Sequence, residues 1–426
     1  MSVDQTAAPP PLVPDDGVVS AAPPRRMASV RTLFALRDFR NYWYGSASFG
    51  LGIWAYITAM GWTALELTDS AFAVSLVNVV YFLPMFLFAL PAGVLADVAD
   101  RRRTAIASRG AGGVVAMVLA FLAGTGNLTF PWLLVLSFLV GVSIITEMAS
   151  RQAYVAQIVA PPQLTNAMAL SAFQGGIARV VGPLLAGWLI AQLGDAGGYG
   201  LFAATNAAFV WFFLRIRTPA KAVRREDRKL VDDLAEGFRY LGQHREARAV
   251  VLISILSGAV GWVYLALMPI MARDVLDGGA VLLGALGMAV GLGSVPSSIY
   301  LSVRTRAGGE GRLFLVAHLT WALGVIVFGM TSSVPVAVVA LFVSGLGFGI
   351  QSVLAQTLLL HLVDQEFHGR VLGLLALTWG ANIVGTLTAG SLADLLGVGL
   401  VVAASGVIII VVTVTTVARN PRLIEA

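Results

Sequence analysis

Residues 182–194 read GPLLAGWLIAQLG, and residues 385–397 read GTLTAGSLADLLG. Seven of the thirteen aligned positions are identical, at a constant offset of 203 residues. A likeness at a fixed offset is the sign of an internal repeat. The alternative is that two helices rich in Gly, Ala and Leu resemble each other through composition alone. The order of the apolar segments along the chain decides between these two interpretations.

Twelve apolar segments are long enough to cross a bilayer, for which a helix needs about 20 apolar residues. They lie at residues 42–65, 72–96, 104–125, 130–150, 167–193, 198–216, 248–272, 279–302, 313–331, 334–360, 370–394 and 397–418. Turn residues separate them cleanly, so a count of eleven or thirteen would require dividing or merging segments. The two matching stretches fall in the fifth and eleventh segments, which predicts two parallel repeats of six spans.

Composition favours lipid as the solvent of this chain. Hydrophobic residues make up 58% of the sequence and charged residues 12%, whereas soluble domains carry roughly 25% charged residues. The net charge is +5, but no basic face is interleaved with aromatic residues, so a nucleic-acid partner is not expected. The chain has no cysteine and its four histidines are scattered, so neither a metal nor another cofactor is expected.

The basic residues predict the orientation, because cytoplasmic loops of membrane proteins are enriched in Lys and Arg. An even number of spans places both termini on one side. If that side is cytoplasmic, 25 of the 28 basic residues lie in inner segments and only Arg273 lies in an outer loop. Arg109 and Arg179 fall within spans. We therefore expect a multi-pass protein of a bacterial inner membrane with both termini in the cytoplasm.

The predicted architecture is an all-α polytopic membrane protein made of two six-helix halves. Its parts are a disordered cytoplasmic tail at 1–38, an amino-terminal half at 39–216, a cytoplasmic linker at 217–247, a carboxy-terminal half at 248–418 and a short cytoplasmic tail at 419–426. The first tail is rich in Pro and Ala, a composition that does not form a core. Apolar residues at helical spacing within 230–241 predict an amphipathic surface helix in the linker.

Small residues of the repeat predict close helix packing, because lipid offers no hydrophobic drive for helix association. The packing candidates are Gly182, Pro183, Gly187, Gly385 and Gly390. Pro183 also removes one backbone donor, which loosens the fifth span where a moving bundle can bend.

The segment after the second span resembles a signature of the major facilitator superfamily. Gly93 is followed by Asp97 four residues later and then by the basic run Arg101–Arg103, although Val98 stands where the signature usually has Arg. Other stretches resemble the enterobactin-exporter-like and multidrug efflux branch: Gly52 to Trp54, Gly61 and Trp62, Leu65 to Ser70, Ser150 to Ala153, Leu164 to Ala167 and Ala178 to Pro183. The resemblance covers roughly residues 32–418 and implies export of a drug, a siderophore or another secondary metabolite.

The resemblance also implies that groups at the inner ends of the spans latch the two halves together in the outward-open state. The gating candidates are Gly93, Asp97, Arg101, Arg102, Arg103, Arg151 and Arg370. Asp97 can meet the positive amino terminus of the eleventh span, which begins near Arg370. The alternative is that these residues are ordinary inner charges that follow the orientation rule.

Arg179 lies about twelve residues into the fifth span, roughly 18 Å along the helix. A buried Arg near the middle of a bilayer costs several kcal/mol, so it should face a partner or a wet cavity. In the cavity it would favour an anionic or carbonyl-rich substrate. The alternative is a structural Arg bonded to backbone carbonyls or to Glu147.

Glu147 is the one acidic residue predicted to lie well inside a span. A protonatable carboxylate there suits proton coupling, as in an antiporter, and pairing with Arg109 explains it equally well. Glu147 and Arg109 are therefore the coupling candidates. The fourth span lacks the mid-helix Arg that many drug–proton antiporters of the superfamily carry, which argues against the usual proton relay of that group.

Polar and aromatic residues of several spans are candidates for a substrate-binding cavity near the midplane. Besides Arg179 they are Trp54, Asn78, Gln174, Trp262, Tyr264, Gln351, Trp379 and Asn382. Aromatic residues of a membrane protein also serve as packing or interfacial anchors. Such a lining suits amphipathic substrates.

The predicted function is secondary active export of a small amphipathic compound by alternating access, coupled to protons. An importer of the same fold is the first alternative. A channel is disfavoured by the repeat, an ATP-driven pump by the absence of a phosphate-binding Gly-Lys-Ser/Thr loop, and an enzyme by the absence of a nucleophile or metal cluster. The expected partners are a small-molecule substrate, the lipid bilayer and protons, and the protein is expected to act as a monomer.

Overall fold

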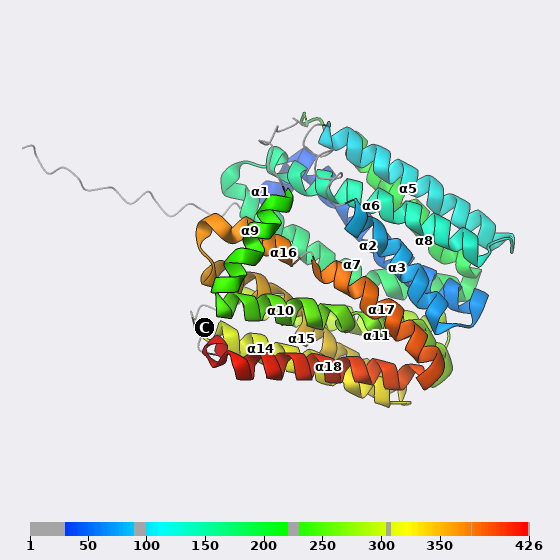
Figure 1. Cartoon of the computed structure of the whole chain (residues 1–426). Helices are drawn as coiled ribbons and strands as arrows, with labels where there is room; N and C mark the ends of the chain where they lie inside the picture. The colour runs from blue at the N-terminus through cyan, green and yellow to red at the C-terminus, as the bar shows by residue number, and fades with distance from the viewer. Residues whose placement is uncertain (1–29, 89–98, 220–229, 304–307, 376, 425–426) are drawn as a thin grey trace, which may run out of the picture.

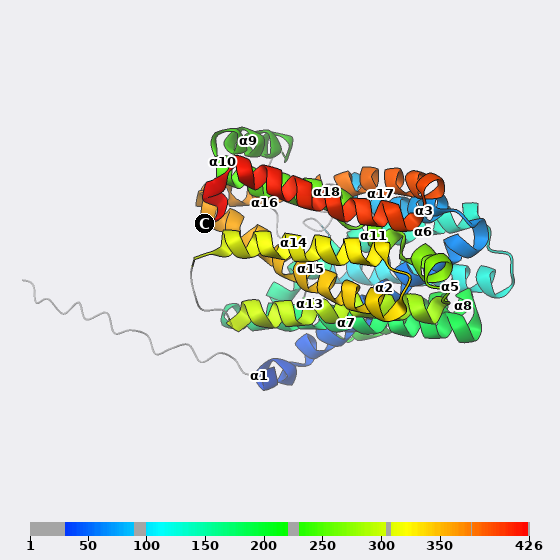
Figure 2. The same cartoon turned by 90° about the horizontal axis from the view of Figure 1, so that it is seen from below.

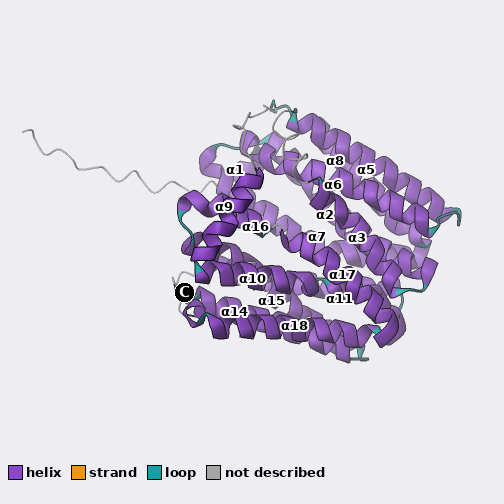
Figure 3. Cartoon of the chain, viewed as in Figure 1, coloured by secondary structure: helices purple, strands orange, loops and turns teal. Residues whose placement is uncertain are grey.

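The structure, a computed structural model, describes residues 30–88, 99–219, 230–303, 308–375 and 377–424. These residues form helices joined by short loops and contain no strand (Figure 3). The first half contains α1 Val30–Ala35, α2 Arg37–Thr68, α3 Ala71–Leu87, α5 Arg101–Gly124, α6 Phe130–Ile158, α7 Leu164–Leu193 and α8 Asp195–Leu214. The second contains α10 Arg245–Gly261, α11 Val263–Ala266, α12 Met268–Ile270, η2 Met271–Val275, α13 Ala280–Val303, α14 Glu310–Met330, α15 Val334–Leu362, α16 His368–Leu374, α17 Leu377–Leu396 and α18 Val398–Arg419.

The long helices run side by side as one bundle (Figures 1 and 2). Helix α1 and the carboxyl terminus lie at the same end of the bundle, which we name the terminal end, and the other end is the opposite end. Within the described ranges, nine helices are long and apolar enough to span a membrane. Helices α2, α3 and α17 lie among them, so the order of helices is consistent with twelve spans. The predicted class, an all-α polytopic membrane protein, is confirmed.

Helix packing repeats between the two halves. In the first half α2 contacts α7 and α8, α5 contacts α6 and α8, and α3 contacts α6. In the second half α10 contacts α17 and α18, α14 contacts α15 and α18, and α13 contacts α15. Each contact has its counterpart six spans later, as a parallel repeat requires. The halves meet mainly where α7 packs on α13 and α3 packs on α17.

Glycines of the matching stretches lie where these helices approach most closely. A methyl group at Gly182 would meet the Leu51 carbonyl of α2 at 2.8 Å, and one at Gly385 would overlap the Ala259 carbonyl of α10. Across the junction of the halves, Gly187 lies against the Ala280 carbonyl of α13. Gly390 lies in the same way against the start of α3. The repeat therefore places equivalent glycines at equivalent contacts.

Two of the predicted spans are interrupted. The seventh span breaks after Gly261 and continues as two short helices, α11 and α12, and the π-helical turn η2. Pro269 lies in this stretch and supplies no backbone donor. The eleventh span is divided into α16 and α17. Irregular backbone inside a membrane is tolerated where it lines a cavity or is buried in protein, and the stretch that follows Gly261 does line one, as described below.

Helical turns lie at both ends of the described part of the chain. Helix α1 begins at Val30, inside the predicted tail, because Leu33 is fully buried and Phe34 packs edge-on against Trp43. Residues 1–29 lie outside the described residues. The last segment forms a short 3-10 turn, η4 Pro421–Ile424, and buries Leu423.

A helix, α9 Leu230–Gln243, occupies the linker stretch for which the spacing predicts one, and it lies across the terminal end (Figure 1). It contacts α10 and α16 of the second half. The Tyr240 hydroxyl donates to Asp364 Oδ2 at 3.1 Å, and Glu236 pairs with Arg370 at 3.0 Å. The linker helix is therefore attached to the carboxy-terminal half.

Candidate transport site

A cavity of about 490 Å³ lies between the two halves. Its volume is within the range of about 300–1,000 Å³ that is typical of small-molecule sites. The predicted residues that line it are Trp54, Asn78, Arg179, Trp262, Tyr264 and Asn382. Sequence reasoning missed further aromatic lining residues, namely Tyr81, Phe82, Trp321 and Phe348. Much of the interrupted seventh span, from Gly261 to Pro269, also lies in this lining.

A second cavity of about 390 Å³ adjoins the first and shares Trp262, Trp321, Phe348 and Asn382 with it. It reaches Gln351 and Gln356 of α15. Helix α15 runs toward the terminal end, so Gln356 lies closer to that end than Phe348 does. The two cavities together therefore extend from the junction of the halves toward the terminal end.

Arg179 extends from α7 toward aromatic rings of both halves. Its Cζ atom lies 5.1 Å from the centre of the Trp54 ring in α2 and 5.9 Å from that of Phe348 in α15. Its Nε atom is buried and hydrogen-bonds to no residue in the described part of the chain. Cation–π contact offsets about 0.5–2 kcal/mol of the cost of burying such a cation, which leaves part of that cost unbalanced.

The polar lining residues keep part of their hydrogen-bonding capacity. Asn78 donates one amide hydrogen to the Val74 carbonyl at 2.9 Å, and Asn382 donates one to the Gly258 carbonyl at 3.4 Å. The second hydrogen and the oxygen of each amide can serve a ligand. Gln174 is buried but is absent from both linings. Trp379 belongs to α17, and its side chain lies outside the described part of the structure.

Glu147 is fully buried in α6, and its partner is Arg151, one turn later. The Arg151 Nε atom donates to Glu147 Oε1 at 2.5 Å, while Oε2 has no hydrogen-bond partner among the described residues. Arg109 is also fully buried, but it donates to Ser143 Oγ at 2.6 Å and lies over the Phe49 ring. The pairing of Glu147 with Arg109 that the sequence suggested is therefore replaced by an i,i+4 pair within one helix, which is a favoured spacing for opposite charges.

Two of the gating candidates lie outside the described residues, and the others have partners that the structure shows. Gly93 and Asp97 lie outside the described residues. Arg102 donates to the carbonyls of Phe213 and Leu214 at 3.0 and 2.8 Å, at the end of α8. Arg103 pairs with Asp100 at 3.7 Å, Arg101 is buried at the start of α5, and Arg370 contacts the linker helix as described above. Arg102, Arg103 and Arg151 are thus held within the amino-terminal half, and their role as a latch stays a prediction.

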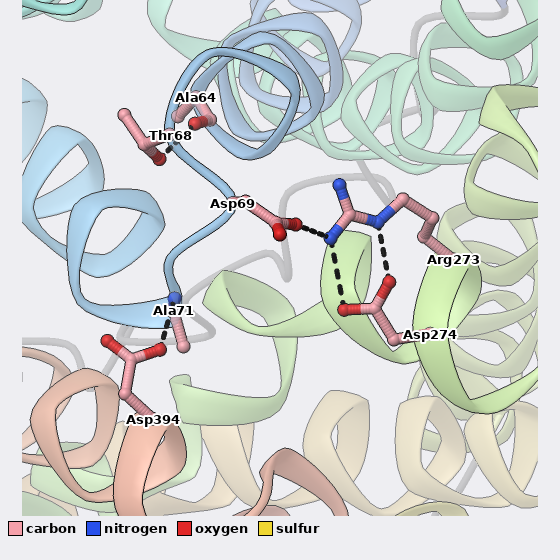
Figure 4. Close-up of polar contacts among 7 residues, drawn as sticks. All are labelled: Ala64, Thr68, Asp69, Ala71, Arg273, Asp274 and Asp394. Carbon is pink, nitrogen blue, oxygen red and sulfur yellow. Dashed lines mark hydrogen bonds and ion pairs between the residues drawn. The ribbon is translucent and has the colours of Figure 1, made fainter.

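Polar contacts join the two halves at the opposite end, and the sequence did not reveal them (Figure 4). Asp394 of α17 accepts hydrogen bonds from the backbone N–H groups of Ala71 and Phe72, at 2.7 and 3.1 Å. Arg273 donates to Asp69 in the loop between α2 and α3, and also to Asp274 at 2.5 Å. Two signals of this cluster are visible in the sequence: Arg273 is the lone basic residue of the predicted outer loops, and Asp394 is an acidic residue near the outer end of the eleventh span.

Comparison with known proteins agrees with this geometry. The family described as transmembrane secretion effector matches residues 29–426. The staphyloferrin A transporter of Staphylococcus aureus is 22% identical over 385 residues, which are 88% of this chain and 94% of that protein. The enterobactin exporter EntS of Shigella boydii is 26% identical over 322 residues, 74% of each chain.

Solved transporter structures share the fold at low sequence identity. The nucleoside transporter NupG has a TM-score of 0.70 at 14% identity and covers 90% of this chain and 98% of its own. The human organic anion transporter MFSD10 has a TM-score of 0.61 at 16% identity, with 89% and 99% covered. From the matched family and this fold, the chain belongs to the transmembrane secretion effector family of the major facilitator superfamily and is a multi-pass membrane transporter.

Proposed function

We propose that this transporter is a secondary exporter that moves a small amphipathic compound out of the cytoplasm by alternating access. The observation that carries the proposal is the cavity between the halves, which combines aromatic walls with one guanidinium and two amides. Substrate sites of transporters with repeated halves lie near the midplane where the repeats meet. A lining of this kind suits a ligand with an apolar body and a few polar groups.

The distribution of cavities and contacts supports a state that loads from the terminal end. The second cavity continues toward that end, whereas Arg273 and Asp394 join the halves at the opposite end. We propose that the terminal end is cytoplasmic, in keeping with the distribution of basic residues. A substrate would then enter the cavity from the cytoplasm.

The name of one relative supports the direction, and the names of both support a small-molecule substrate. One relative is called an exporter of enterobactin and the other a transporter of staphyloferrin A. Both are less than 30% identical to this chain, so we extend to it only the general class of a small compound.

We propose that a proton gradient drives export and that Glu147 is the group that takes up the proton. The support is its complete burial together with one carboxylate oxygen that no described residue satisfies. Protonation would neutralise the Glu147 carboxylate and weaken its pair with Arg151, so that the Arg151 cation would lose its ion-pair partner in α6. A neutral Glu147 would thus favour a different packing of α6.

Transport in everted membrane vesicles tests the direction. Vesicles that pump protons inward would be given siderophores, macrolides and aromatic acids, with and without a protonophore. We expect uptake of at least one compound, and its loss when the protonophore is added. If a solute instead accumulates in intact cells and nothing enters energised vesicles, the transporter is an importer.

A further inference from the structure

The charge of the cavity lining is concentrated on one residue. Among the described residues that line the two cavities, Arg179 is the one charged side chain. The buried carboxylate of α6, Glu147, is already bonded to Arg151 and does not line the cavities. The cavity is therefore positive, and no carboxylate of the described lining neutralises it.

The surroundings of Arg179 leave its donors available. The Trp54 and Phe348 rings contact its cation, and neither ring carries an oxygen or nitrogen atom that accepts a hydrogen bond. No described residue accepts a hydrogen bond from Nε. A guanidinium has five N–H donors in a fork that matches two oxygens of a carboxylate. A ligand with an acidic oxygen pair would satisfy donors that the protein leaves unsatisfied.

We propose that Arg179 recognises an anionic group of the substrate, and that the substrate is an aromatic or otherwise apolar compound carrying a carboxylate or a comparable acidic oxygen pair. This inference rests on the proposed transport site and names its substrate class. The rings of Trp54, Trp262, Trp321 and Phe348 supply stacking surfaces for the apolar body. A cationic compound would meet the like charge of Arg179 in a site of low polarity, where repulsion is strong.

The position of Arg179 also ties the anion to the movement of the halves. Arg179 and Trp54 belong to the amino-terminal half, whereas Phe348 belongs to the carboxy-terminal half. A relative movement of the halves changes the distance between Phe348 and the guanidinium. An anion held by Arg179 stays with the amino-terminal half and keeps the cation neutralised while the ring is displaced.

Calorimetric titration of the purified full-length protein in detergent tests the inference. The probes are 2-naphthoate, its neutral carboxamide and the cationic 2-naphthylmethylamine, which share one aromatic body. We expect the carboxylate to bind and the amine not to bind. Losing hydrogen bonds to a charged group weakens binding about ten- to a hundredfold, so Arg179→Gln should bind naphthoate that much more weakly. Arg179→Lys keeps the charge but not the forked set of donors, so its affinity for naphthoate should lie between those of the wild type and Arg179→Gln.

Arg215→Gln is the matched control, because Arg215 also lies over a tryptophan ring, 3.4 Å from the centre of Trp211, and is absent from both cavity linings. It should bind naphthoate as the wild type does. Equal binding of the carboxamide and the carboxylate, full binding by Arg179→Gln, or no binding of naphthoate to the wild type would overturn the inference. Energised export of a neutral or cationic compound would leave the proposed function intact and refute the anion site. Binding of naphthoate without energised uptake of any compound would leave the anion site intact and refute the proposed export.

Discussion

The Asp394 carboxylate accepts a hydrogen bond from the backbone N–H of Ala71 at 2.7 Å, across a separation of 323 residues. Asp394 belongs to α17 and Ala71 begins α3, so the contact joins the two halves at the opposite end (Figure 4). The amino terminus of a helix carries a partial positive charge and unsatisfied N–H groups, which a carboxylate stabilises. Asp394 is exposed whereas Ala71 is buried, so the contact lies at the edge of the packed junction between α3 and α17.

Removing this carboxylate should favour opening at the opposite end. A helix cap contributes about 1 kcal/mol, so Asp394→Ala should lower the ratio of closed to open states about fivefold. The chain has no cysteine, and spin labels at Leu67→Cys and Leu395→Cys would report the distance between α2 and α17. We expect a longer distance to gain population. Ser391→Ala, whose hydroxyl bonds only within α17, is the control; an unchanged distance distribution in Asp394→Ala would refute this role.

Arg273→Gln should have a weaker effect than Asp394→Ala. The Arg273–Asp69 pair is exposed, and such pairs contribute about 0–1 kcal/mol. At an ionic strength of about 1 M the Debye length is about 3 Å, so salt should reproduce the effect of the substitution in the wild type. The same spin-label pair measures it. A salt response of equal size in Arg273→Gln would show that other charges are responsible.

Two glycines of α7 should respond oppositely to the same substitution. Gly187 lies against the Ala280 carbonyl of α13, whereas a methyl group at Gly175 would meet nothing within 4 Å. Overpacking costs about 1–3 kcal/mol, so Gly187→Ala should lower the thermal stability of the purified protein. Gly175→Ala should raise it slightly, because alanine is the better helix former by up to about 1 kcal/mol. Equal effects would mean that the junction of α7 and α13 is not tightly packed.

Glu147→Gln should separate substrate exchange from energy coupling. The variant cannot release a proton, so uphill uptake into energised vesicles should fall to the background. Exchange of substrate down its own gradient should continue, because Glu147 does not line the cavity. Glu246→Gln, which removes a carboxylate in the first turn of α10 and outside both cavity linings, should transport as the wild type does. Normal uphill uptake by Glu147→Gln would assign the coupling to another group.

Much of the fold follows from the sequence, since span length and a repeat are local signals. The match between the stretches at Gly182 and Gly385 predicts the parallel halves, and the packing of α7 and α17 on equivalent partners agrees with it. The break after Gly261 was not predicted, because the seventh span is apolar throughout. Hydropathy reports the environment of a segment and not its backbone geometry.

The site was only partly predictable. Arg179 is visible because a charge in the middle of a span is rare and costly. Phe348 and Trp321 were missed because an apolar span does not show which face meets the cavity. Glu147 and Arg151 are four residues apart, a spacing that is visible in the sequence. Arg109 is an equally plausible partner from the sequence, because it also lies within a span. The role of Asp394 at the junction of the halves rests on a contact between distant segments, which no local sequence pattern reveals.

Reconstitution of the purified protein into liposomes with an imposed pH gradient tests the central claim, proton-driven export, most directly. An antiporter accumulates substrate in liposomes with an acidic interior, whichever way the protein is inserted, because protons leave as substrate enters. Passive partition of a carboxylate gives the opposite sign, since a permeant acid collects on the alkaline side. We predict accumulation of the exported compound with an acidic interior and none without a gradient. Accumulation only with an acidic exterior, and above the level in protein-free liposomes, would show symport and contradict the account.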